Sequence, residues 1–157
     1  MNTEELTHLL KHLVAHSRAL FLGVFASDKH HTLNSFQSLV PICYVTNNDP
    51  PAKGGSHWNS FFQARPNRLE FYDSYGRQPC EFGFSFPKSL QIFHNPYQIQ
   101  ALGTQVCGHF CIYILYHRAH NYALNSICKR FSILPFVRSA SIVSSFIRNA
   151  HERINKK

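Results

Sequence analysis

Hydrophobic residues recur at helical spacing at both ends of the chain. In residues 4–14 they occupy one face of a predicted helix, and Thr3 is placed to cap its first turn. The apolar positions there are Leu6, Leu9, Leu10, Leu13 and Val14. Residues 139–154 show the same pattern, and an apolar run from about Cys107 to Tyr122 predicts a third helix. One face of the terminal helix carries Ile142, Val143, Phe146, Ile147, Ala150 and Ile154.

Short runs rich in branched and aromatic residues lie between these helices and predict strands. The runs are LFLGVF (20–25), LVPICYV (39–45), HWNSFFQA (57–64), RLEFYDSY (68–75) and YQIQALG (97–103). The third and fourth are separated only by RPN, which predicts a hairpin. Polar loops include one with His30 and His31 and another over 47–56, and 76–86 is irregular. Residues 87–93 are predicted to form a short helix or turn.

The order of these elements predicts an α+β fold with the strands grouped in the middle of the chain. With 157 residues, 44% of them hydrophobic, and no repeat or linker, we expect a single domain over 1–157. No window reaches the apolar length of a membrane span, and the first residues lack a secretory pattern. We therefore expect no membrane partner and no secretion.

Charge and cysteine content add two expectations. The 16 Lys and Arg against 8 Asp and Glu give a net charge of +8, which favours contact with polyanions. The basic residues are scattered, so solubility explains them equally well and nucleic acid is a secondary partner. Five cysteines are an odd number, which indicates reduced thiols in a cytosolic or nuclear setting.

Cys107 is the candidate nucleophile. It follows a predicted strand and loop and opens a predicted helix, where unpaired backbone N–H groups and the helix dipole favour a thiolate. Gly108 beside it has no side chain to keep a substrate carbonyl away from the backbone. Cys111, one turn further on, is interpreted as a packed structural thiol.

A cysteine nucleophile also needs a base and a group that orients the base. Of the eleven histidines, His57 is the best candidate because it opens a predicted strand after a Gly-rich loop and is followed by Trp58. In the paired strand, alternation puts Asp73 on the face of apolar residues and Glu70 on the opposite face, where we expect it to be solvated. Asp73 is therefore the candidate orienting group, although Asp also favours the start of a turn in DSYG.

An amide side chain near Cys107 would complete the site by binding the oxyanion together with the Cys107 backbone N–H. Gln98, Gln100 and Gln105 qualify by position. Gln105 is close to Cys107 in sequence, whereas Gln100 precedes a loop, ALGT, that can turn it toward the site. Gln100 is therefore preferred.

These segments, GGSHW, FYDSYG, a glutamine seven residues before a cysteine, and CGHFC, stand in the order found in a known family. The chain resembles the adenovirus-type cysteine proteases, adenain and the enzymes of adintoviruses and Maverick/Polinton elements, within the wider clan of SUMO-specific (Ulp-like) proteases. The likeness covers nearly three-quarters of the chain. It implies a papain-like fold in which a central mixed sheet is packed between helices, with His57 as base, Asp73 as orienting acid, Cys107 as nucleophile and Gln100 as oxyanion donor.

The resemblance also implies a function. The members of this family cut viral or element-encoded capsid precursors during particle maturation. By resemblance we expect a polypeptide substrate, a monomeric enzyme and a location in the virion or the host nucleus or cytoplasm. No cofactor is required for the chemistry, but DNA or a peptide is implied as an activator. The adenoviral enzyme has a cysteine near the position of Ser89 that captures its peptide, so a disulfide-linked activator is not expected here.

Three alternatives use the same residues differently. The first is a protease that removes ubiquitin-like proteins from their conjugates. The second is a basic nucleic-acid-binding module without catalytic turnover. The third is a zinc site built from Cys80, Cys107, His109 and Cys111, which is disfavoured because C-x-x-x-C without a second ligand pair is unlike structural zinc motifs, so no metal is expected.

Overall fold

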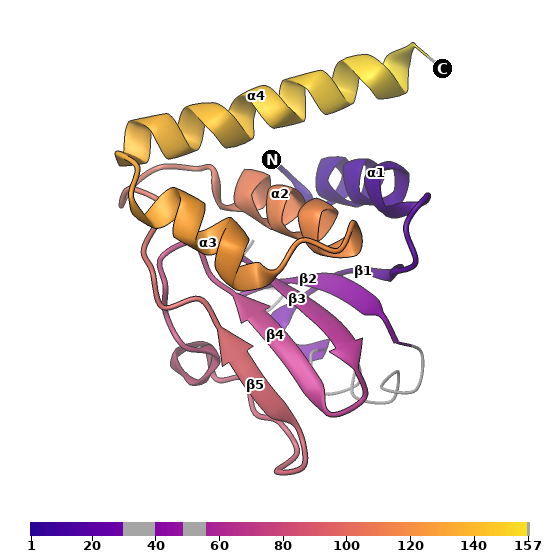
Figure 1. The fold of residues 1–157 in the computed structure, drawn as a ribbon, viewed down its shortest axis with the longest axis vertical. Coiled ribbons are helices and arrows are strands. Elements are labelled where there is room, and N and C mark those ends of the chain that lie inside the picture. The colour runs from indigo at the N-terminus through magenta and orange to yellow at the C-terminus, as the bar shows by residue number, and fades with distance from the viewer. Residues whose placement is uncertain (30–39, 49–55, 157) are drawn as a thin grey trace.

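The computed structural model of the protein describes residues 1–29, 40–48 and 56–156. The predicted loop with His30 and His31 and most of the predicted loop over 47–56 lie outside these ranges. The described residues form a five-stranded mixed sheet and four α-helices, as Figure 1 shows, so the predicted α+β fold class is confirmed. In the part of the chain that the structure describes, no helix is both long and apolar enough to cross a membrane.

The strands follow one another across the sheet in chain order. They are β1 (Leu20–Phe25), β2 (Ile42–Asn47), β3 (Trp58–Arg65), β4 (Arg68–Tyr72) and β5 (Gln91–His94). The inner pairs β2–β3 and β3–β4 are antiparallel, whereas β1–β2 and β4–β5 are parallel. The hairpin predicted around RPN is confirmed as the β3–β4 connection.

The fifth strand differs from the prediction, which placed it over 97–103. The strand is Gln91–His94, which overlaps the segment predicted as a short helix or turn, and its four residues pair with Arg68 to Phe71 of β4. Residues 97–103 cross the end of β4 instead, where the backbone N–H groups of Ile99 and Gln100 both donate to the carbonyl of Ser74. The alternating apolar residues of this segment imitate a strand, but only Ile99 among them is buried, and it packs beside Tyr72 at the end of β4.

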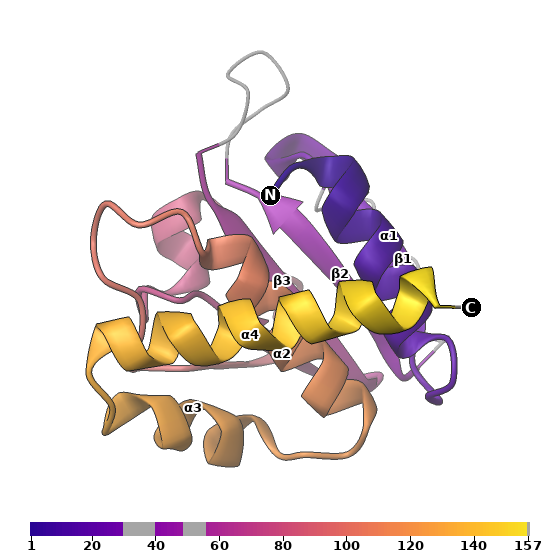
Figure 2. The ribbon, with the colours of Figure 1, turned by 90° about the horizontal axis from the view of Figure 1, so that it is seen from above.

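The four helices all lie on one face of the sheet. They are α1 (Thr3–Val14), α2 (Cys107–Ala119), α3 (Leu124–Ser132) and α4 (Phe136–Asn155). α2 packs directly on β3, and α4 lies across α1 and α2 on the outside (Figures 1 and 2). The helix-side core joins residues of α1 such as Leu6 and Leu10 to Cys43, Val45 and Phe62 of the sheet.

The opposite face of the sheet is covered by an irregular aromatic segment. Residues 79–90, which include the 3₁₀ turn η3 (Pro79–Phe82), pack Phe84 and Leu90 on Phe61 and Phe71. The expectation of a sheet packed between helices is therefore wrong within the described residues. Tightly packed aromatic rings can cover this face without a second helical layer.

Two local expectations about the helices were also incomplete. The side chain of Asn2, not Thr3, caps α1, since it accepts a hydrogen bond of 2.9 Å from the backbone N–H of Glu5. α3 is not among the helices predicted from the sequence, although its buried residues recur at helical spacing. These residues are Leu124, Ile127, Cys128 and Phe131.

Candidate active site

Cys107 is the first residue of α2 and opens onto a cleft of about 370 Å³. The cleft is lined by Met1, Ser56, His57, Trp58, Tyr75, Thr104, Gln105, Cys107 and Gly108. A Cβ at position 108 would lie 2.9 Å from the sulfur of Met1, so the flexible Met1 side chain would have to shift to admit it. Without a side chain at position 108, Met1 can pack against the start of α2 beside the thiol.

His57 lies directly before β3 and is buried, with 5% of its surface exposed. Its ring is stacked with two aromatic neighbours, with ring centroids 4.9 Å from Tyr75 and 6.0 Å from Phe82. Its Nε2 atom is hydrogen-bonded to a carboxylate oxygen of Asp73. Since Nε2 is engaged there, Nδ1 is the ring nitrogen left to interact with Cys107, and the two groups shift each other's pKa.

Asp73 directly follows β4 and is fully buried. Its second carboxylate oxygen accepts hydrogen bonds from the backbone N–H of Arg77 at 2.9 Å and from the Arg77 side chain at 3.2 Å. The turn interpretation of DSYG is also correct, because the Gly76 N–H donates to the Asp73 carbonyl at 2.9 Å. The turn brings Arg77 back to the carboxylate, so the local and the functional interpretations describe one arrangement.

Asn95 was not singled out by sequence and fixes the backbone of Asp73. Its side-chain oxygen accepts from the Asp73 N–H at 3.0 Å, and its amide nitrogen donates to the Asp73 carbonyl at 2.8 Å and to the Tyr97 carbonyl at 3.0 Å. Asn95 follows β5 and is 1% exposed. The Asn95 side-chain amide therefore binds the Asp73 backbone just beyond the point where the β4–β5 pairing ends.

The electrostatics of the three groups are coupled. Burial opposes the ionised form of the Cys107 thiol, but its hydrogen bond to His57, the charge of that ring and the backbone N–H groups of Trp58 and Gly108 outweigh burial, so the pKa of Cys107 is lowered. Burial likewise opposes charge on His57, yet the bonds to Asp73 and Cys107 raise its pKa. For Asp73, the contacts with His57 and Arg77 outweigh burial and lower the pKa. This arrangement favours a thiolate beside an imidazolium.

Gln100 is adjacent to the cleft without lining it. Its amide nitrogen donates to the Thr104 carbonyl at 2.8 Å and to the Tyr75 hydroxyl at 3.2 Å, and its oxygen accepts from the Ser74 hydroxyl at 2.6 Å. The glutamine that lines the cleft is Gln105, the candidate that its closeness to Cys107 in sequence disfavours. The structure thus brings together Cys107, His57 and Asp73, with Gln100 behind the wall of the cleft.

The other thiols have different surroundings. Cys111 is buried one turn after Cys107 and donates through its sulfur to the Trp58 carbonyl at 3.4 Å, and burial raises its pKa. Cys43 and Cys128 are buried too, and burial raises the pKa of each to about 12. Cys80 is exposed, and all five cysteines are free. Among the described residues, no group of three acidic, histidine or cysteine side chains is arranged to hold a metal ion.

Glu70 contradicts the expectation that it is solvated. It is 5% exposed, and its carboxylate is held in a two-point ion pair by Arg118 of α2, at 2.6 and 3.0 Å. Strand alternation correctly separated it from Asp73, but the face it occupies is the one covered by α2.

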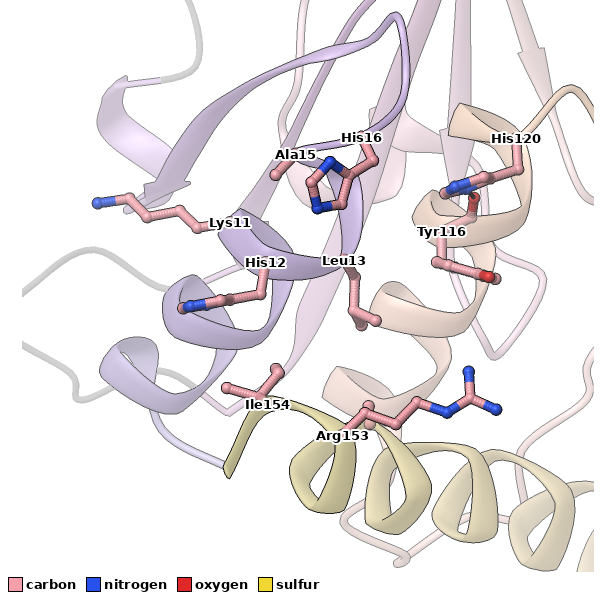
Figure 3. A pocket seen from close by; sticks show the side chains of 10 residues that line it. Lys11, His12, Leu13, Ala15, His16, Tyr116, His120, Arg153 and Ile154 are labelled. Atoms are coloured by element: carbon pink, nitrogen blue, oxygen red, sulfur yellow. Dashed lines mark hydrogen bonds between the residues drawn. The ribbon is translucent and has the colours of Figure 1, made fainter. Parts of the chain in front are cut away.

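A separate cavity of about 460 Å³ lies where α1, α2 and α4 end, and it contains none of these groups. In Figure 3, His16 and His120 lie on one side of Leu13, and Arg153 lies on the opposite side of it. The side chains of Lys11 and His12 project away from Tyr116. Basic side chains at helix C-termini complement the helix dipole, so their presence here has a structural explanation.

Comparison with known proteins gives a match of fold only. No family model and no curated protein matches the chain. A solved structure, the central domain of the uncharacterized Lpg1148 protein from Legionella pneumophila, is similar over 100% of this chain and 98% of that one, with a TM-score of 0.62 and 16% sequence identity.

Proposed function

We propose that this protein is a cysteine endopeptidase with a papain-like fold of the adenain and Ulp type. The observation that carries the proposal is the arrangement of Cys107, His57 and Asp73, in which a thiol with a lowered pKa contacts a histidine oriented by a buried carboxylate. A nucleophile at a helix start, a base and an orienting acid are the groups that thiol-based acyl transfer requires.

In the acylation step, the Cys107 thiolate attacks the carbonyl carbon of the scissile peptide bond. The backbone N–H of Cys107 is one donor for the resulting oxyanion, because the first N–H groups of a helix have no partner within it. The His57 imidazolium then gives its proton to the leaving amine, and Asp73 keeps the ring in the orientation this transfer needs. Water, deprotonated by neutral His57, hydrolyses the acyl-enzyme.

Gln100 remains our proposal for the second oxyanion donor. Its longer hydrogen bond is the one to the Tyr75 hydroxyl, at 3.2 Å, and Tyr75 lines the cleft. Exchanging that bond for one to the oxyanion would leave the bond to Thr104 intact. Gln105, whose side chain lines the cleft, is the competing donor, and Gln100→Ala and Gln105→Ala variants distinguish them by which loses more kcat.

By resemblance, the substrates are capsid or other structural precursors of a virus or transposon, cut during particle maturation. The same likeness suggests a monomer in the virion or the host nucleus or cytoplasm, with DNA or a non-covalently bound peptide as activator. The chemistry of the three groups requires no cofactor. Proteases that remove ubiquitin-like proteins share this chemistry and differ in substrate.

The test is hydrolysis of a panel of substrates that contains capsid-precursor peptides, ubiquitin conjugates and SUMO conjugates. We expect turnover of precursor peptides that is lost in Cys107→Ala and retained in Cys111→Ala, a matched change one turn along the same helix. Undiminished cleavage by Cys107→Ala would exclude this nucleophile. Turnover of the ubiquitin or SUMO conjugates alone would support the proposed cysteine chemistry but contradict capsid precursors as the substrate class.

A further inference from the structure

A cavity of about 410 Å³ lies between the β3–β4 hairpin, β5 and the start of α3. It shares no lining residue with the cleft at Cys107, and its volume is in the range of small-molecule sites. Three arginines and His94 line it. Its one carboxylate, Glu70, is already bound at two points by Arg118.

The two other arginines are in an unfavourable arrangement. Arg65 and Arg68 are direct partners across the β3–β4 ladder, and like charges at opposed positions destabilise a sheet. The Arg68 guanidinium lies 3.8 Å from the centroid of the Phe93 ring, and its Nε atom is 3.7 Å from a carboxylate oxygen of Glu70. Arg118 binds the Glu70 carboxylate more closely, at 2.6 Å. Both side chains are exposed, so their guanidinium groups remain accessible from the cavity.

The opposite wall of the cavity adds a second positive feature. α3 begins with Ala123 as its N-cap, without a capping side chain and without an acidic residue in its first turn. Ala123, Leu124 and Asn125 line the same cavity as the arginine pair, and the first N–H groups of a helix have no partner within it. Unlike the cavity at the helix C-termini in Figure 3, the helix end here reinforces the charge of the basic side chains.

We propose that this cavity binds a small phosphate monoester, with its phosphate between Arg65, Arg68 and the first turn of α3. A dianionic phosphate relieves the repulsion of the paired arginines and accepts hydrogen bonds from guanidinium and backbone donors together. The partly exposed ring of Phe93 beside Arg68 provides an apolar contact for the rest of the ligand. The site is independent of the proposed peptidase chemistry.

Calorimetric titration of the full chain with phenyl phosphate, at constant ionic strength in chloride, tests the proposal. We expect Arg65→Gln and Arg68→Gln each to weaken binding about tenfold or more. Arg148→Gln is the matched control, because Arg148 is an exposed arginine of α4 outside the cavity, and it should leave the affinity unchanged. Equal losses in all three variants, or no saturable binding by the unmodified protein, would overturn the proposal.

Asn125→Asp separates binding from folding. A carboxylate in the first turn of α3 stabilises the helix but repels an anion, so we expect an equal or higher melting temperature together with weaker phenyl phosphate binding. Unchanged binding in this variant would contradict a site at α3. A short oligonucleotide without a terminal phosphate is titrated in the same way as a competing ligand. If it binds more tightly than phenyl phosphate and depends on Arg65 and Arg68, the cavity is a nucleic-acid site and the small-molecule proposal is refuted.

Discussion

Asp73 connects the fold to the chemistry at the scale of single residues. Its backbone ends β4 and starts a turn, while its carboxylate contacts His57 on one side and Arg77 on the other. Because the carboxylate is fully buried, its charge acts on the imidazole with little screening. Removing that charge without changing the shape of the side chain therefore isolates its effect.

Asp73→Asn should narrow the pH range of activity from both sides. The raised pKa of His57 depends on Asp73, so without the carboxylate the imidazolium loses its proton at lower pH and the alkaline limb of kcat/KM moves down. Less imidazolium also weakens the lowering of the Cys107 pKa, so the acid limb moves up. We expect kcat/KM at the optimum to fall by on the order of 10²–10⁴. Limbs that stay in place would show that Asp73 does not set the charge of the pair.

Asn95→Ala should affect positioning without affecting titration. It leaves the buried N–H and carbonyl of Asp73 without their partner, at a cost of about 2–3 kcal/mol in unfolding free energy. We expect lower kcat, nearly constant KM and an unchanged pH profile, since all ionising groups remain. Urea unfolding and pH-rate curves measure these effects, with exposed Asn149→Ala as control. A shifted pH profile would assign Asn95 an electrostatic role.

Predictability from sequence differed among these residues for physical reasons. Asp73 could be found because carboxylates are few and strand alternation put it on an apolar face. Asn95 could not, because its contact with Asp73 spans 22 residues and depends on where β5 ends. Strand alternation predicts which face of the sheet Glu70 occupies, but it does not predict which element covers that face. The burial of Glu70 therefore could not be predicted from the sequence.

At the scale of elements, the ion pair between Glu70 and Arg118 joins β4 to the C-terminal half of α2. α2 carries Cys107 at its other end, so this pair helps to fix the axis along which the nucleophile is presented. Glu70 also has a second, exposed arginine neighbour, Arg68, at 3.7 Å. The two arginines thus allow a buried and an exposed contact with the same carboxylate to be compared.

Arg118→Gln should cost about 2–4 kcal/mol in unfolding free energy, because it leaves the Glu70 carboxylate buried without its main partner. Arg68→Gln should cost at most about 1 kcal/mol, since that side chain is 44% exposed and its ion pair is screened. Urea titrations of the two variants measure the difference. Equal costs would contradict the assignment of Arg118 as the partner that stabilises the carboxylate.

The elements with strong periodicity could be read from sequence, and those defined by their neighbours could not. α1, α4 and the β3–β4 hairpin follow from local patterns. β5 has only four residues and exists because β4 offers its edge, whereas the more strand-like segment 97–103 is held outside the sheet. The aromatic cover over 79–90 has no repeating pattern that predicts it, and the second helical layer expected in its place was implied only by the family resemblance.

For the whole molecule, the net charge of +8 bears on the nucleic-acid alternative. The basic residues are scattered along the sequence, so we expect few simultaneous phosphate contacts and therefore DNA binding at about 50 mM salt that is largely lost by about 200 mM. Fluorescence anisotropy with a labelled duplex measures this dependence. Binding that persists at higher salt would indicate a dedicated nucleic-acid surface and favour the basic-module hypothesis.

The central claim is that His57 makes Cys107 a reactive thiolate, and alkylation by iodoacetamide, followed at each cysteine by mass spectrometry across pH 4–10, tests it most directly. Exposed Cys80 serves as an internal reference for a thiol outside the site. The account predicts that Cys107 is alkylated at acidic pH, well below the pH at which Cys80 reacts, and that His57→Ala removes this difference. Parallel pH dependence of Cys107 and Cys80, unchanged by His57→Ala, would contradict it.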